Sequence, residues 1–124
     1  YQSEFMNQYQ LHGTYAPCAS YRLLKKAADT AEEMKLNYKV GSVVSGDVFY
    51  SELPELVWAK MGVLAGEMEC AALYAVAARA GKEALCMCTI SDIIGGDAAN
   101  NLTPEERQSS FDEMIRLALE VADE

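Results

Sequence analysis

The sequence has few basic side chains and no long hydrophobic run. Its 10 lysines and arginines stand against 19 aspartates and glutamates, which gives a formal net charge of -9. Such a protein is repelled by the phosphates of nucleic acids and anionic membranes, so we expect neither as a partner. No apolar run approaches the roughly 20 residues that span a bilayer, and no basic segment leads into an apolar stretch at the start. We therefore expect a cytoplasmic protein.

Histidine is almost absent as well, since His12 is the only one, and this limits the metal sites that the chain can form. The four cysteines are Cys18, Cys70, Cys86 and Cys88. They stand among apolar residues and have neither the spacing of a zinc site nor that of a small secreted disulfide framework. We expect buried, reduced thiols, with no bound metal and no cofactor.

The composition that remains is typical of a folded domain with one modest core. Hydrophobic residues make up 51% of the 124 residues and charged residues 23%. A chain of this length buries a smaller fraction of its surface than a large one does, and a second core is not expected. We expect a single domain over residues 1–124.

The first half of the chain predicts a helix between strands. Residues 10–15 suit a short strand. Over residues 21–36, apolar side chains recur at helical spacing with charged ones between them, which predicts an amphipathic helix. Residues 38–45 are β-branched and aromatic, Gly46 interrupts them, and the apolar character resumes over residues 48–50. We expect one strand followed by a functional or bulged turn.

The second half of the chain continues the alternation of helices and strands. Residues 54–61 suit a short helix, and the alanine-rich residues 67–80 predict a fully buried helix that stops at Gly81. The apolar run over residues 84–90 is typical of a parallel strand covered on both faces. Thr-Pro-Glu-Glu at residues 103–106 is a start signal for the last helix. Its expected apolar face is Phe111, Met114, Ile115, Ala118, Leu119 and Ala122. We predict an α/β fold, a mixed central sheet flanked by helices, with ligands at the carboxyl ends of the strands.

Asp92 is the first candidate for chemistry. With Ser91 it follows the apolar run of residues 84–90 and precedes a glycine-bearing loop. This is where α/β proteins expose catalytic and ligand-binding side chains. An acid at this position could donate a proton, provided that burial or a neighbouring charge lets it hold one near neutral pH. A solvated or capping aspartate at a strand end is the other interpretation, and spacing does not decide between the two.

Three further groups of residues are candidates, and the first two have two interpretations each. Glu67 and Glu69 flank Met68 at the expected start of a helix, where they could complement the helix dipole or accept hydrogen bonds from sugar hydroxyls. Phe49 could stack on a planar base or belong to the core. Arg107 stands in the first turn of a helix, where a positive charge is mildly unfavourable, so we expect a partner elsewhere.

Five stretches of the sequence together resemble the hexameric purine nucleoside phosphorylases of bacteria. In order they are Val-Gly-Ser at 40–42, Ser-Gly-Asp-Val-Phe-Tyr at 45–50, Gly-Glu-Met-Glu at 66–69, Thr-Ile-Ser-Asp at 89–92 and Glu-Arg-Gln-Ser-Ser-Phe at 106–111. The resemblance extends from about residue 9 to about residue 121 and covers the C-terminal half of a family member. Ile93 departs from the polar residue that usually follows the Ser-Asp pair.

The resemblance implies phosphorolysis of purine (deoxy)ribonucleosides to the free base and (deoxy)ribose 1-phosphate. Asp92 would protonate the purine at N7, and Arg107 would pair with Asp92 and assist. The residues that would bind the substrate are Val48, Phe49, Glu67, Met68, Glu69 and Ser91. Among these, Glu69 would bind the ribose hydroxyls, Met68 would pack on the sugar, and Phe49 would stack on the base.

The resemblance also implies that half of the site is missing. In the family, phosphate, the co-substrate, is held by a glycine-containing loop and arginines of the N-terminal half, with help from a neighbouring subunit of a hexamer. This chain has no such loop, and we expect its N-terminal strands to be absent and apolar surface to be exposed unless a homo-oligomer or a partner covers it. Two alternatives stay open, a hydrolytic nucleosidase and a non-catalytic, truncated nucleoside-binding fragment.

Overall fold

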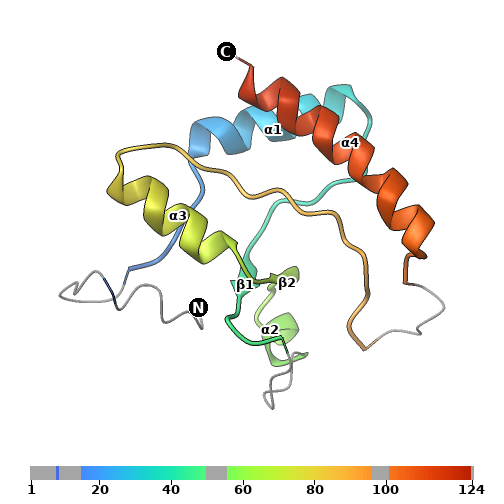
Figure 1. Ribbon diagram of the computed structural model, residues 1–124, viewed down its shortest axis with the longest axis horizontal. Helices are drawn as coiled ribbons and strands as arrows, with labels where there is room; N and C mark the ends of the chain where they lie inside the picture. Colours follow the sequence, from blue (N-terminus) through green and yellow to red (C-terminus); the bar gives the residue numbers. More distant parts are fainter. Residues whose placement is uncertain (1–7, 9–14, 50–55, 96–100, 124) are drawn as a thin grey trace. The chain divides into compact units, whose positions relative to one another are not determined.

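The computed structural model describes residues 8, 15–49, 56–95 and 101–123. In chain order the elements are α1 (Tyr21–Glu33), β1 (Val43–Ser45), α2 (Leu56–Lys60), β2 (Ala65–Glu67), α3 (Cys70–Arg79) and α4 (Pro104–Ala122), as labelled in Figure 1. The chain divides into a first unit, Tyr1–Tyr21 with Gly41–Cys86, and a second unit, Arg22–Val40 with Met87–Glu124. None of the described helices has the length and hydrophobicity that crossing a membrane requires. The mixed α/β class that the sequence predicts is confirmed.

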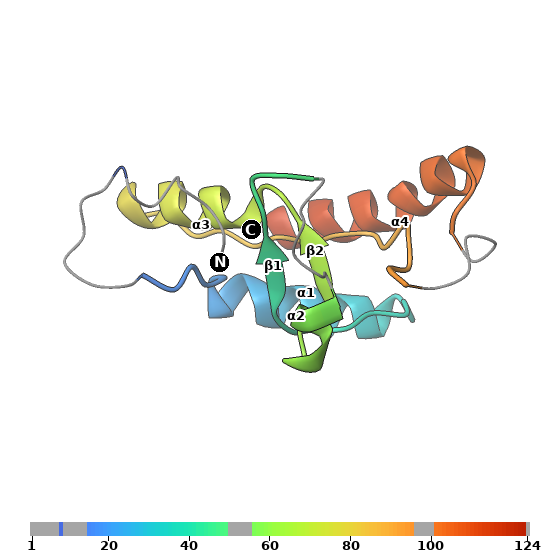
Figure 2. The ribbon, with the colours of Figure 1, turned by 90° about the horizontal axis from the view of Figure 1, so that it is seen from below.

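The first unit contains a small parallel sheet. Strands β1 and β2 pair in parallel, with Val43 opposite Ala65 and Ser45 opposite Glu67, and lie side by side in Figure 2. The pairing continues beyond the strands, because Gly46 N donates to the Glu67 carbonyl oxygen at 3.0 Å. Since the strands are parallel, both end at one edge of the sheet, which we call the carboxyl edge. The segments that follow Ser45 and Glu67 both leave from this edge.

The predicted strand over residues 38–50 is shorter than expected. Only Val43–Ser45 forms a strand, Val48 and Phe49 lie beyond it, and Tyr50 is outside the described residues. A strand is defined by its ladder, and β2 offers just three paired residues. The expected strand at residues 10–15 falls mostly outside the described residues.

Helix α3 differs from the prediction in its start and in its burial. The expected helix began at Glu67, but Glu67 ends β2 and the helix begins at Cys70. Leu73 and Val76 are 45% and 51% exposed, so the expectation of burial on every face is wrong. The described residues of this unit cover only one face of the helix, and the apolar side chains of the other face stay in contact with solvent.

The other helix boundaries of the first unit agree with the sequence. Gly81, with φ of 65°, ends α3 as predicted. Its N–H donates to the Ala78 carbonyl oxygen at 3.1 Å, and Lys82 N–H donates to that of Ala77 at 2.8 Å. This is the Schellman arrangement, which favours glycine in the left-handed position. Helix α2 lies within the short helix predicted over residues 54–61.

The apolar run over residues 84–90 does not form the predicted strand. Two of its main-chain groups have partners: the Ala84 carbonyl oxygen accepts from Ser20 N at 2.8 Å, and Cys86 N donates to the Tyr74 hydroxyl at 2.9 Å. No described strand pairs with it, and Ile90 is 55% exposed. The hydrophobic pattern is that of a covered strand, but a strand also needs a neighbouring ladder on which to pair.

Cys70 and Cys86 form a disulfide, with their Cα atoms 5.9 Å apart. The expectation of reduced thiols is therefore wrong for this pair, although Cys70 is buried as expected. The expectation of burial is wrong for Cys18 and Cys88, which lie outside the disulfide and are exposed. The Tyr74 hydroxyl bond to Cys86 N holds the residue 86 backbone beside α3. Sequence spacing cannot reveal this proximity, because it arises from the return of the chain along the helix.

The second unit contains α1 and α4. In α1 the buried residues are Ala27 and Ala31, one helical turn apart, as the predicted amphipathic pattern requires. The Lys26 ammonium group donates to the Asp123 carbonyl oxygen near the end of α4. In α4 Val121 is buried, at 5% exposure. The Lys26 hydrogen bond thus joins α1 to the residue that follows α4.

The predicted apolar face of α4 is only partly covered. Met114 and Ala118 are half-buried, and Val121, which the prediction left out, is buried. The exposed members of the predicted face include Phe111 at 36%, Ile115 at 49% and Leu119 at 65%. The helical period is correct, but the side of the helix that the described residues cover is rotated from the predicted one.

Candidate functional site

The first unit gathers five of the predicted substrate-binding residues at the carboxyl edge of the sheet. The members of this carboxyl-edge group are Val48, Phe49, Glu67, Met68 and Glu69. Val48 and Phe49 follow β1 and are 66% and 68% exposed. Met68, at 40% exposure, and the exposed Glu69 form the bend between β2 and α3. The parallel register places both segments beyond the same edge, where α/β proteins bind ligands.

Glu67 is held by hydrogen bonds on both carboxylate oxygens. Oε1 accepts from the Ser45 hydroxyl. Oε2 accepts from the backbone N–H of Glu69 at 2.7 Å and of Cys70 at 2.6 Å. The Ser45 Oγ in turn accepts from Ala71 N–H at 2.9 Å. Two side chains from the ends of β1 and β2 therefore cap the first N–H groups of α3, where negative charge is favoured.

Glu69 is oriented differently from Glu67. Its side chain makes no capping hydrogen bond to α3, although it occupies the N-cap position, and its residue is exposed. The dipole interpretation of the sequence thus describes Glu67, whose oxygens are engaged by the protein. Glu69 presents an exposed carboxylate at the same edge, and that carboxylate can accept hydrogen bonds from a ligand.

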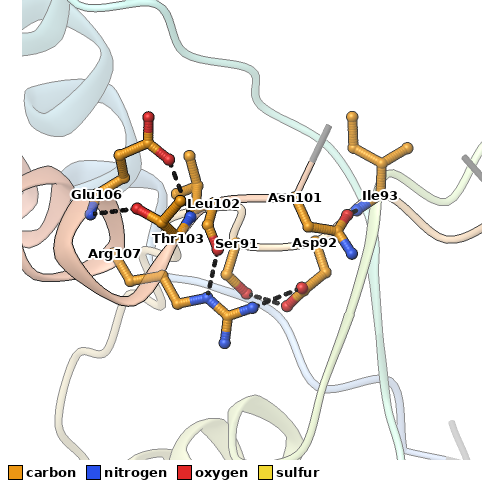
Figure 3. A network of polar contacts seen from close by, with 8 residues as sticks. All are labelled: Ser91, Asp92, Ile93, Asn101, Leu102, Thr103, Glu106 and Arg107. Carbon is orange, nitrogen blue, oxygen red and sulfur yellow. Dashed lines mark hydrogen bonds and ion pairs between the residues drawn. The ribbon is translucent and has the colours of Figure 1, made fainter. Parts of the chain in front are cut away.

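The second unit brings Asp92 and Arg107 together. Arg107 Nη2 lies 2.8 Å from Asp92 Oδ1, and the two side chains are 43% and 47% exposed. Ser91 Oγ donates to Asp92 Oδ2 at 2.7 Å, so each carboxylate oxygen accepts one hydrogen bond. Figure 3 shows these residues pointing toward one another. The partner that the sequence required for Arg107 is Asp92.

Local structure at the start of α4 positions Arg107. Thr103 is the N-cap, and its hydroxyl accepts from Glu106 N–H at 3.2 Å, while its own N–H donates to Glu106 Oε2 at 2.9 Å. Hydrogen bonding with Thr103, first with its backbone and then with its side chain, holds the pKa of Glu106 below its ordinary value. The predicted capping box is therefore confirmed. It fixes the turn from which Arg107 projects.

Further bonds join the two ends of the loop that separates Asp92 from α4. Arg107 Nε donates to the Leu102 carbonyl oxygen at 3.1 Å. Leu102 N donates to the Ser91 carbonyl oxygen at 3.0 Å. Ile93 N donates to Asn101 Oδ1 at 3.0 Å, as Figure 3 shows. Backbone hydrogen bonds thus hold the residues on either side of Asp92, and the Leu102 carbonyl oxygen holds the Arg107 side chain. Such support restricts the geometry of the ion pair.

The ion pair is partly open to solvent. Asp92 and Arg107 are each about half exposed. Arg107 and Ser91 both donate to the Asp92 carboxylate. A planar ligand placed over the pair would exclude water from it and strengthen these electrostatic contacts.

Sequence reasoning missed three contributors to these groups. Ser45 stands in the recognised stretch of residues 45–50 but was assigned no role, and it is the hydroxyl that joins Glu67 to α3. The Asn101 side chain, which accepts from Ile93 N–H, and the Leu102 carbonyl oxygen, which accepts from the Arg107 side chain, support the second group. A serine at a strand end opposite a glutamate predicts such a bond only once the register of the two strands is known.

Cys70 and Cys86 offer no thiolate to a metal while they form a disulfide.

Comparison with known proteins gives a consistent match. Residues 2–124 match the family model described as the Phosphorylase superfamily. A protein named "Purine nucleoside phosphorylase DeoD-type" from Caldanaerobacter subterraneus subsp. tengcongensis is 47% identical over 121 residues, which are 94% of this chain and 51% of the relative. Proteins of the same name from Clostridium perfringens and Thermoanaerobacter sp. are 48% and 45% identical over 94% and 95% of the chain, and 50% and 51% of the relatives. The chain spans about half the length of these curated relatives.

Proposed function

The chain belongs to the phosphorylase superfamily, and on that premise we propose that it forms the nucleoside-binding part of a purine nucleoside phosphorylase. The reaction would transfer the (deoxy)ribosyl group of a purine nucleoside to phosphate. The observation that carries the proposal is the ion pair of Asp92 and Arg107, 2.8 Å apart beside Ser91. An acid held by a guanidinium suits a reaction in which a base departs and must be protonated.

Asp92 is the proposed general acid. As the bond from ribose C1′ to purine N9 breaks, its electron pair passes to the base, and Asp92 donates a proton to N7. Phosphate oxygen forms the new bond to C1′, which gives (deoxy)ribose 1-phosphate and free purine. Arg107 stabilises the Asp92 carboxylate that the proton transfer leaves behind, because its guanidinium already donates to Oδ1. The purine itself covers the half-exposed pair and excludes water.

The carboxyl-edge group is the proposed sugar and base subsite. Glu69 accepts hydrogen bonds from the ribose hydroxyls, and its exposed carboxylate supports that role. Met68 packs on the sugar, while Phe49 and Val48, both about two-thirds exposed, contact the base. Glu67 acts through the backbone of Glu69 and Cys70 rather than through a direct contact with the sugar.

Phosphate is the proposed co-substrate, and no cofactor is needed for the transfer. We place the phosphate site in the half of the relatives that this chain does not match. Assembly into a homo-oligomer, a cytoplasmic location and a role in purine salvage are part of the same proposal. Exposed apolar side chains such as Leu119, at 65%, and Ile115, at 49%, support assembly, because contiguous apolar surface favours association.

The test is purine release from inosine and adenosine, with and without phosphate. The purified chain is measured alone and assembled with a polypeptide that supplies the unmatched half of the Caldanaerobacter relative, and free base is followed by chromatography. Phosphate-dependent release by the assembled protein, lost in Asp92→Asn, supports the proposal. Release that does not change when phosphate is omitted would establish the nucleosidase alternative. Inosine binding without release in a stably assembled protein would establish the non-catalytic one.

A further inference from the structure

Ser45 is the one buried polar residue among those that the structure describes, at 6% exposure. It ends β1, and its hydroxyl has two partners. It donates to Glu67 Oε1 and accepts from Ala71 N–H at 2.9 Å. The hydroxyl therefore bridges a strand end, a carboxylate on the neighbouring strand and the first turn of α3.

The bridge determines the bend that carries Met68 and Glu69. Glu67 Oε2 accepts from the N–H groups of Glu69 and Cys70, and Ser45 accepts from the next N–H, that of Ala71. Three successive N–H groups are thus fixed by two side chains. With its carboxylate oriented by Ser45, Glu67 can meet both N–H groups at once. Loss of the Ser45 hydroxyl would leave a buried N–H and one carboxylate oxygen without a partner.

We propose that Ser45 is a positioning residue for ribose recognition, acting through Glu67 on the bend of Met68 and Glu69. This inference rests on the proposed function, because Glu69 is the residue that would accept hydrogen bonds from the sugar hydroxyls. The Ser45 hydroxyl fixes Glu67, Glu67 fixes the Glu69 backbone, and the Glu69 carboxylate is then held where the hydroxyls can reach it. Ser45 itself does not touch the nucleoside.

A positioning role and a merely structural role predict different ligand selectivity. If the bend of residues 68 and 69 loosens, the contact of Glu69 with the ribose hydroxyls weakens, while stacking of the base is unaffected. Inosine should then lose affinity, whereas 2′,3′-dideoxyinosine, which lacks both hydroxyls, should not. A general loss of stability would reduce the active fraction for both ligands equally.

The experiment compares Ser45→Ala, Ser45→Thr and the matched control Ser42→Ala, an exposed serine that precedes β1. Affinities of the chain for inosine and 2′,3′-dideoxyinosine are measured by calorimetry. We expect Ser45→Ala to weaken inosine binding about tenfold, the effect of losing one hydrogen bond to a charged group, and to leave dideoxyinosine binding unchanged. Ser45→Thr, which keeps a hydroxyl, should restore selectivity for inosine, and Ser42→Ala should match the wild type.

A second readout needs no ligand. Amide hydrogen exchange at Glu69, Cys70 and Ala71 should become faster in Ser45→Ala and remain slow in Ser45→Thr. Faster exchange with an unchanged ratio of the two affinities would overturn the positioning role and leave the proposed function intact. Equal affinities of the wild type for inosine and dideoxyinosine would instead overturn the proposed function.

Discussion

The two groups of candidate residues are held in opposite ways. At the carboxyl edge, the Ser45 and Glu67 network joins segments 22 to 26 residues apart and contains a buried hydroxyl. Asp92 and Arg107 are 15 residues apart, about half exposed, and supported by a capping box within one loop and helix turn. The first group is held by hydrogen bonds that include a buried hydroxyl. The second is an ion pair about half exposed to solvent.

This difference separates two tasks. Recognition of a sugar needs fixed acceptors, and a preorganised bend provides them with little loss of entropy on binding. Proton donation needs a carboxylate whose surroundings change when the base is bound. The predictions below disturb one group at a time, so that a change in one task can be told from a change in the other.

Replacing Asp92 should have the largest effect. We expect Asp92→Asn to lower kcat for inosine phosphorolysis by about 10²–10⁴-fold in the assembled protein, because the proposed general acid is removed. Affinity for inosine should change little, since the amide is isosteric. The measurement is steady-state release of hypoxanthine, with Asp112→Asn, an exposed residue of α4, as the control. An equal loss in both variants would contradict the assignment.

Reducing the disulfide should have the next largest effect, and it concerns only the first unit. The bond between Cys70 and Cys86 closes a loop with a sequence separation of 16. Its loss should lower the free energy of unfolding by about 3 kcal/mol, according to the loop-entropy model. Urea unfolding with and without dithiothreitol measures this change. The reductant should have no effect on the Cys70→Ser, Cys86→Ser double variant, and an equal shift there would exclude the bond as the cause.

Removing the Glu67 cap should have a moderate effect. Glu67→Ala deprives the Glu69 and Cys70 N–H groups of their acceptor, and we expect stability to fall by about 1–2 kcal/mol, as for other helix caps. Thermal unfolding followed by circular dichroism gives the shift, and Glu33→Ala, at the exposed end of α1, is the control. If Glu67→Ala changed kcat of the assembled protein while leaving stability untouched, Glu67 would be a direct participant rather than a cap.

The smallest effect concerns the capping box of the second unit. The pKa of Glu106 is lowered by its bonds with Thr103, so its folded value lies below its unfolded value. The stabilisation is therefore full above the ordinary glutamate range, about 4.3, and is lost as pH falls through the folded value. Glu106→Gln should remove this part of the acid dependence, measured as the unfolding midpoint against pH. Glu105→Gln in the same turn should leave it unchanged.

The elements that the sequence predicts well are those with local causes. Helix α1 follows from its 3.6-residue period, α4 from the Thr103 box, and the end of α3 from Gly81, which adopts a positive φ. Each signal lies within a few residues of the feature it predicts. The pairing of Asp92 with Arg107 was expected only from the resemblance, because the two residues approach across a loop.

The predictions that failed depend on distant neighbours. Residues 84–90 have the pattern of a buried strand but no described strand beside them, and the Cys70–Cys86 bond arises where the chain returns along α3. Strand β2, Ala-Gly-Glu, has no β-branched residue, so Glu67 was placed in the helix. The sequence does not predict the contact of Ser45 with Glu67 for the same reason, because that contact depends on the register of β1 against β2.

The most direct test of the central claim is equilibrium binding of inosine to the 124-residue chain, measured by titration calorimetry in the absence of phosphate. We expect saturable binding of one inosine per chain, lost in Glu69→Ala and retained in Asp92→Asn. Absence of saturable binding by the folded chain, or binding that Glu69→Ala leaves unchanged, would contradict the claim that these residues form a nucleoside site.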